Sequence, residues 1–206
     1  MRFSRFVLLA GAIAGLNILV IQAVPKLITG QEAMSQEKMQ AQIMKYGTPG
    51  KPHELFKKLA GEWDVEVTAT PPMPGAQPQK SKGTMKSELI FGGRYLKSDF
   101  DGMMGNESSK GLQINGYDLF KNVYSTFWID SWSTSFLILT GRLDASGKVL
   151  TQTGQSPNAM TDGKTMDRIR AVTTLLDEGK YKFELFMTMG TGPEMKTLEL
   201  IYTRKM

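Results

Sequence analysis

The sequence predicts an all-β protein, an antiparallel up-and-down barrel of about ten strands preceded by N-terminal helices. From Glu62 onward, apolar and polar residues alternate with a period of two, as in strands with one buried face. These segments recur at a spacing of roughly 10 to 15 residues, with turn residues and no convincing helix between them. So many short strands joined by tight turns must curl or close, which favours a barrel.

The N-terminus has the pattern of an export segment. Arg2 and Arg5 precede residues 6–24, which carry no charge. As a helix this stretch would span about 28 Å, nearly a bilayer core, so residues 1–24 are expected to be a cleaved signal peptide ending near Ala23 or an uncleaved membrane anchor. A buried core helix is the third alternative. In the first two cases the barrel is periplasmic or secreted, and this segment is its only membrane contact.

Two helices are expected before the strands. Residues 25–52 form a polar linker, within which 31–46 is expected to be a spacer helix. A proline- and glycine-rich break follows. A short helix is predicted at 53–60, because its apolar residues share one face and Gly61 suits its C-terminal stop. The barrel domain is therefore placed at 53–206.

The strands are bounded by turn signals. A proline-rich loop is expected at 71–82, a tight hairpin turn at Gly92–Gly93 and a glycine-rich turn at 101–110. In this interpretation Gly102, Gly105 and Gly111 are turn glycines. The expected strands are 62–70, 84–91, 94–100, 112–118, 123–130, 135–143, 148–154, 166–175, 180–189 and 196–204.

The composition excludes several classes of function. The net charge is +5 and the basic residues form no run or stripe, so nucleic acid is not an expected partner. The absence of cysteine excludes disulfides, thiolate metal sites and cysteine nucleophiles. His53 is the only histidine and precedes the strands, so we interpret it as a polar residue at a helix N-terminus. No metal and no cofactor are predicted.

One strand carries charge on a face that could line the barrel. Arg168 and Arg170 share one face of the strand expected at 166–175, and a turn at 177–179 would bring Val172 opposite Glu184. We expect Arg170 and Glu184 to face inward and pair, because an unpaired internal charge is very costly. The alternative is an ion pair on the surface, which would contribute little to stability.

Aromatic and methionine side chains on the strands are further candidates for a pocket, although they can equally fill the core. Together with the charged residues, the expected ligand-binding positions are Arg94, Arg170, Glu184, Phe127 and Met187.

Five segments, spread over about 49–206, carry a family resemblance: TPGKPHELFKKLAGEWDVEV, FGGRYLKSDF, GYDLFKNVYSTFWID, RIRAVTTLLDEGKYKFELF and LELIYTRKM. Through them the chain resembles a bacterial family called domain of unknown function fifteen seventy-nine. The family is described as lipocalin-like, with a Gly-x-Trp motif opening the first strand of a calycin-type barrel, and it has no established activity. The resemblance therefore implies a fold and no mechanism.

The resemblance also implies how the barrel closes. Calycin-type barrels place an arginine of the final strands across the indole of the Gly-x-Trp motif, so Arg204 is expected to stack on Trp63. The short helix at 53–60 would cover the same end, and a ligand would enter from the other. Haem-binding relatives use a histidine of a late strand, and this chain has none there.

These observations leave three classes of function. The favoured one is an extracytoplasmic barrel that binds a small apolar or amphipathic molecule. The second is a structural or interaction protein of the cell envelope with a filled barrel. The third is an enzyme of the isomerase or cyclase type, with Arg170, Glu184 or Arg94 as participants. A cavity wide enough for a ligand would favour the first class, and a solid core the second.

Overall fold

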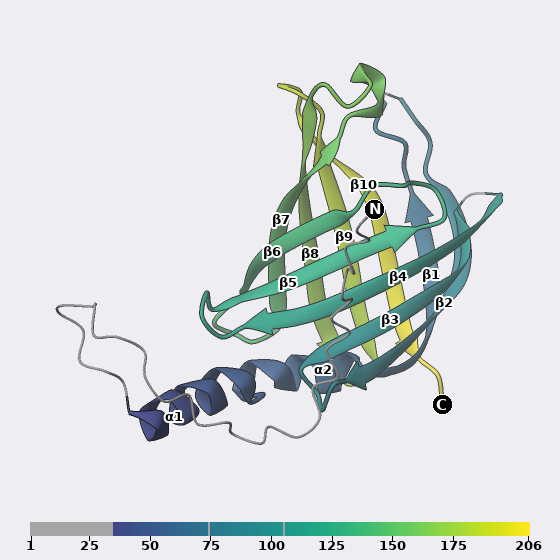
Figure 1. The fold of residues 1–206 in the computed structure, drawn as a ribbon. Helices are drawn as coiled ribbons and strands as arrows, with labels where there is room; N and C mark the ends of the chain where they lie inside the picture. The colour runs from purple at the N-terminus through teal and green to yellow at the C-terminus, as the bar shows by residue number, and fades with distance from the viewer. Residues whose placement is uncertain (1–34, 74, 105) are drawn as a thin grey trace, which may run out of the picture. The chain divides into compact units, whose positions relative to one another are not determined.

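The computed structural model describes residues 35–73, 75–104 and 106–206. The expected signal or anchor at 1–24 lies outside these residues. Within them, no helix is long and apolar enough to cross a membrane. The elements, labelled in Figure 1, are α1 (Gln36–Gly47), η1 (Lys51–His53), α2 (Glu54–Leu59), β1 (Gly61–Ala69), β2 (Gln79–Ile90), β3 (Tyr95–Met104), β4 (Glu107–Asp118), β5 (Val123–Asp130), β6 (Leu137–Leu143), β7 (Val149–Pro157), η2 (Ala159–Thr161), β8 (Met166–Asp177), β9 (Lys180–Thr188) and β10 (Glu194–Arg204).

The ten strands form a closed antiparallel barrel (Figure 1). Each strand pairs with its neighbours in sequence, and β1 closes the sheet by pairing with β10. At this seam Trp63 lies opposite Arg204 and Val67 opposite Leu200. The predicted all-β, up-and-down barrel of about ten strands is confirmed.

The period of two in the sequence corresponds to the two faces of the wall. On β1, Trp63, Val65 and Val67 point into the barrel and are each 1% exposed, whereas Asp64 and Glu66 are exposed outside. Burying these side chains against those of opposite strands removes apolar surface from water, which is the main favourable term in folding. Alternation therefore specifies which face of each strand is inside.

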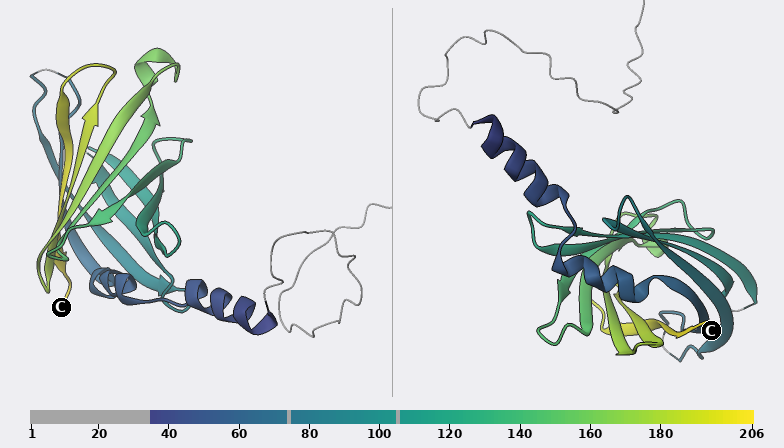
Figure 2. Two further views of the ribbon diagram at one scale, coloured as in Figure 1. Left: turned by 90° about the vertical axis from the view of Figure 1, so that its left-hand side faces the viewer. Right: turned by 90° about the horizontal axis from the view of Figure 1, so that it is seen from below.

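The predicted helix at 53–60 is present as η1 followed by α2, which lies across one end of the barrel (Figure 2). Leu55 and Phe56 are buried there against Leu96 and neighbouring residues of the wall. His53 is buried too, and its Nδ1 accepts a hydrogen bond from the Gly50 amide at 3.1 Å. Burial lowers the pKa of His53, so the imidazole is a neutral structural group.

The spacer helix expected at 31–46 is represented by α1, which has no buried residue. Residues 31–34 of that prediction lie outside the described part of the chain. Near the end of α1, the ring of Tyr46 stacks on Phe120 at 3.8 Å between centroids.

The glycine-rich turn expected at 101–110 is wrong, because β3 continues to Met104 and β4 begins at Glu107. Gly102 and Gly111 lie within strands. A Cβ on Gly102 would come within 2.6 Å of the Gly83 Cα, so this glycine permits a close approach of two strands. Glycine is required at these positions by side chains and backbone of neighbouring strands, which the local sequence does not show.

Candidate functional site: the barrel lumen

One end of the barrel is closed by a stack of Arg204 on Trp63. The Arg204 Cζ lies 4.1 Å from the centre of the indole. Its guanidinium donates to the carbonyls of Ala60, at 2.8 Å, and Lys58, at 2.7 Å, and the Trp63 Nε1 donates to the Leu59 carbonyl at 3.0 Å. The predicted closure is confirmed. The stack also fixes α2 over this end, which we call the α2 end.

Behind this seal lies a layer of buried tyrosines. Tyr181 packs edge-on against Trp63, with centroids 4.7 Å apart, and stacks on Tyr202 at 4.1 Å. Burial raises the pKa of both phenols above the usual value. The α2 end is therefore closed by packed aromatic side chains.

Above the tyrosines, uncharged polar side chains face the lumen. Ser87 donates to Ser98 at 2.8 Å, and Thr126 Oγ1 lies 2.7 Å from Asn115 Oδ1 and 3.0 Å from Gln152 Oε1. Most of them line an enclosed cavity of about 40 Å³, room for roughly one or two water molecules. We call the following set the polar belt: Ser87, Ser98, Gln113, Asn115, Thr126, Gln152 and Thr173.

The hydrogen bonds of Thr126 constrain the belt further. A hydroxyl carries one hydrogen, so Thr126 can donate to only one of the two amide oxygens beside it. The other amide must turn its NH₂ group toward Thr126. The amide side chains of Asn115 and Gln152 therefore present both donors and acceptors, which suits a neutral partner with either kind of group.

The end of the barrel opposite α2, which we call the mouth, is formed by the strand ends at Ala69, Gln79, Met104, Glu107, Asp130, Leu137, Pro157, Met166, Thr188 and Glu194. Three inward side chains are only half-buried. Trp128 and Phe183 lie opposite the belt residues Gln113 and Thr173, and Met187 lies nearer the mouth. Other inward side chains on the mouth side, such as Val67, Phe100 and Ile169, are buried, so accessibility is confined to part of the lumen.

The indole of Trp128 is held in a defined position. A Cβ on Gly111 would lie 2.1 Å from the Trp128 ring, so the indole covers the bare backbone of β4. Its Nε1 donates to Asp130 Oδ2 at 2.8 Å. Gly111, expected to be a turn residue, instead shapes the lumen wall.

The expectation that Arg170 and Glu184 face inward and pair is wrong. The predicted register is correct, since Val172 lies opposite Glu184. However, Ile169 and Ala171 occupy the inward face of β8, and alternation places the arginines outside. The apolar residues occupy the interior because an arginine there would need a buried partner.

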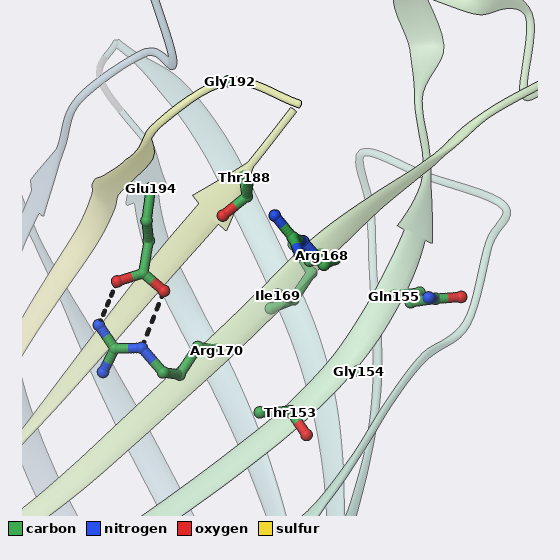
Figure 3. A pocket seen from close by; sticks show the side chains of 9 residues that line it. All are labelled: Thr153, Gly154, Gln155, Arg168, Ile169, Arg170, Thr188, Gly192 and Glu194. Atoms are coloured by element: carbon green, nitrogen blue, oxygen red, sulfur yellow. Dashed lines mark hydrogen bonds and ion pairs between the residues drawn. The ribbon is translucent and has the colours of Figure 1, made fainter. Parts of the chain in front are cut away.

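Arg170 instead binds Glu194 across the outer wall (Figure 3), with 2.9 Å between Nε and Oε1. Its guanidinium lies 3.9 Å from the centre of the Phe186 ring. The hydrogen bond from Arg170 lowers the pKa of Glu194. Arg170 and Glu194, together with Arg168 and Thr188, line an open groove of about 600 Å³ outside the barrel.

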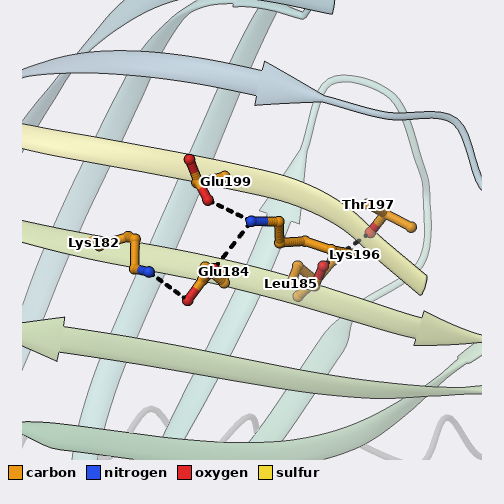
Figure 4. A network of polar contacts seen from close by, with 6 residues as sticks. All are labelled: Lys182, Glu184, Leu185, Lys196, Thr197 and Glu199. Atoms are coloured by element: carbon orange, nitrogen blue, oxygen red, sulfur yellow. Dashed lines mark hydrogen bonds and ion pairs between the residues drawn. The ribbon is translucent and has the colours of Figure 1, made fainter. Parts of the chain in front are cut away.

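Glu184 has different partners from those expected (Figure 4). Its carboxylate contacts Lys182 Nζ at 2.9 Å and Lys196 Nζ at 3.2 Å, and Lys196 also bonds Glu199. Burial alone would raise the pKa of Glu184, but the hydrogen bonds from the two lysines lower it. This network belongs to the outer surface.

Of the remaining candidates, only Met187 faces the lumen. Phe127 lies on the outer face of β5, with its ring 5.2 Å from that of Phe136. Arg94 lies in the β2–β3 turn and donates to the Phe91 carbonyl at 2.9 Å. The polar belt was not among the predicted site residues, although Asn115 and Gln152 share the parity of the inward residues of their strands.

The family model described as "Protein of unknown function (DUF1579)" matches residues 48–204. The chain belongs to this family. Its barrel is similar to that of Rv2717c from M. tuberculosis, with a TM-score of 0.55 and 13% identity over 77% of this chain and 100% of that one. It is also similar to the S-type phycobiliprotein lyase CPES from Guillardia theta, with a TM-score of 0.53 and 9% identity over 76% and 94%.

At such identities the similarity shows the fold alone, which is that of lipocalin-like barrels. No curated protein matches this DUF1579 chain. In the described part of the chain, no three histidine or acidic side chains gather closely enough to hold a metal ion.

Proposed function

We propose that this DUF1579 protein binds a small amphipathic molecule in its lumen, which the ligand enters through the mouth. The observation that supports this is the partial accessibility of some inward side chains. Trp128, Phe183 and Met187 face inward but are only half-buried, whereas a core residue such as Phe56 is 1% exposed. Partly accessible aromatic and methionine side chains form adaptable apolar walls.

The size of the enclosed cavity defines the arrangement of the ligand. A volume of about 40 Å³ holds only a small group. The polar end of the ligand would bond to the belt, and its apolar body would lie along Trp128, Phe183 and Met187 toward the mouth. Each contact would replace water on an apolar wall.

Titration with N-phenyl-1-naphthylamine, an uncharged dye whose fluorescence rises in apolar surroundings, tests this proposal. We expect saturable binding of one dye per chain. Met187→Trp should fill the lumen and weaken binding at least about tenfold. Phe127→Trp places the same side chain on the outer wall and is the matched control, which should bind as wild type does. Absence of saturable binding, or equal binding by both variants, would contradict the proposal.

We further propose that the protein acts outside the cytoplasm. The support is the pair Arg2 and Arg5 followed by the uncharged stretch 6–24. Fusing residues 1–34 to an alkaline phosphatase, which is active only after export, should give active enzyme, and replacing both arginines with glutamate should reduce it. An inactive wild-type fusion would count against export.

A barrel without a ligand, serving in structural or interaction roles, is the second candidate. It is favoured by the small enclosed cavity, because much of the lumen is already filled by side chains. In that case dye binding would be absent and Met187→Trp would change only stability.

A further inference from the structure

Cations are almost absent from the inner face of the described barrel wall. Every lysine and arginine on the described strands β1–β10 occupies an outward register position, except Arg204 at the seam. Arg204 is already engaged by Trp63 and by the carbonyls of Lys58 and Ala60. No free cation therefore faces the lumen from these strands.

Carboxylates show the opposite arrangement at the mouth. Three of them occupy inward register positions near the ends of their strands: Glu107 opposite Met104, Asp130 opposite Gly111, and Asp167 opposite Ser156. Asp130 is held by Trp128, and Asp167 accepts from Asn158 Nδ2 at 2.8 Å. These bonds come from neutral groups, so the rim of the lumen carries negative charge without a paired cation there.

The polar belt between these two regions is neutral, since it consists of hydroxyl and amide side chains. An anionic group placed there would lose its hydration without gaining a cation, which is very costly. Turned the other way, the same group would meet the acidic rim at Glu107, Asp130 and Asp167 and be repelled. Both orientations of an anionic amphiphile are therefore disfavoured.

We infer that the ligand carries an uncharged hydrogen-bonding end, such as a hydroxyl, carbonyl or amide, and that the lumen discriminates against carboxylates and phosphates. This inference rests on the proposed function. The donors and acceptors around Thr126 match such a group, because each of these ends needs one or both kinds of partner.

The arginines near the mouth do not alter this conclusion. Arg168 and Arg170 lie on the outer face of β8, and Arg170 is paired with Glu194 (Figure 3). Their guanidinium groups are separated from the lumen by the wall itself, in which Ile169 is the inward residue.

Displacement of bound N-phenyl-1-naphthylamine by decan-1-ol, decanamide and decanoate at pH 7.5, all below micellar concentrations, tests the inference. The three probes share one chain length and differ in the polar end. We expect the alcohol and the amide to displace the dye at concentrations at least about tenfold below that of decanoate. Gln113→Arg introduces a cation into the belt and should remove this preference, whereas Leu112→Arg, on the outer face of the same strand, should keep it.

The outcomes separate the two proposals. Equal displacement by all three probes, or tighter binding of decanoate, overturns the inference and leaves the binding function standing. Failure of the dye to bind wild-type protein overturns the binding function and the inference with it. Saturable dye binding by Gln113→Arg shows that the variant is folded, and an unchanged preference in that variant contradicts the role of the belt.

Discussion

At the scale of single residues, the seal at the α2 end depends on Gly61 as much as on Arg204. Gly61 has φ of 130°, and a Cβ there would lie 2.3 Å from the Arg204 Nη1. Two features require glycine at this position: the positive φ, and the guanidinium that passes close over the residue. Gly-x-Trp and the distant arginine are thus one structural unit.

Arg204→Ala should lower the free energy of unfolding by about 2 kcal/mol, because it removes the stack on Trp63 and leaves two carbonyls unbonded. Urea titration measures the loss. Lys205→Ala is the control, since Lys205 only approaches Asp64 at 3.7 Å on the surface and should cost less than about 0.5 kcal/mol. Similar losses in the two variants would show that the stack contributes nothing.

Three buried phenols make stability depend on alkaline pH. Burial raises the pKa of Tyr124 to about 12 and raises those of Tyr181 and Tyr202 as well. In the unfolded chain these groups ionise near pH 10, while the folded protein keeps them neutral. Stability is therefore fully present below about pH 10 and falls above it, by up to about 4 kcal/mol per pH unit if all three contribute.

Urea titrations at pH 9, 10 and 11 measure this slope. Tyr202→Phe should make it shallower by about a third, because each phenol contributes about 1.4 kcal/mol per pH unit. Comparing the two proteins cancels the titration of lysines. A slope that is unchanged in the variant would mean that Tyr202 ionises equally in both states.

At the scale of elements, α2 acts as a plug. Phe56→Ala should lower the free energy of unfolding by about 3 to 5 kcal/mol, because a fully buried ring leaves a cavity among Leu55, Leu96 and Tyr124.

The same substitution should also admit water to Trp63. In a Trp128→Phe, Trp132→Phe background, acrylamide should quench the remaining indole more strongly after this change. Lys57→Ala, on the exposed side of the same helix, should leave both readouts unchanged, and quenching that does not differ between the two would contradict the plug.

Pairing of the strands could be predicted from the sequence because alternation and short turns leave few other topologies. The faces of β8 could not, since apolar residues stand on both: Ile169 and Ala171 on one, Val172 on the other. Only the closed barrel decides which set is buried. The polar belt could not be predicted for the same reason. The sequence does not distinguish an inward asparagine such as Asn115 from an exposed one, and only closure of the sheet places its side chain inside.

At the scale of the whole molecule, the pairing of β1 with β10 has a consequence for folding. These strands are the first and last of the barrel, so the seam cannot form until β10 is available. Until then β1 and β9 are unpaired edges, which readily add strands of other molecules. An export pathway that carries unfolded chains would therefore have the whole interval before β10 pairs with β1 in which to act. Deletion of β10 should yield a chain that aggregates.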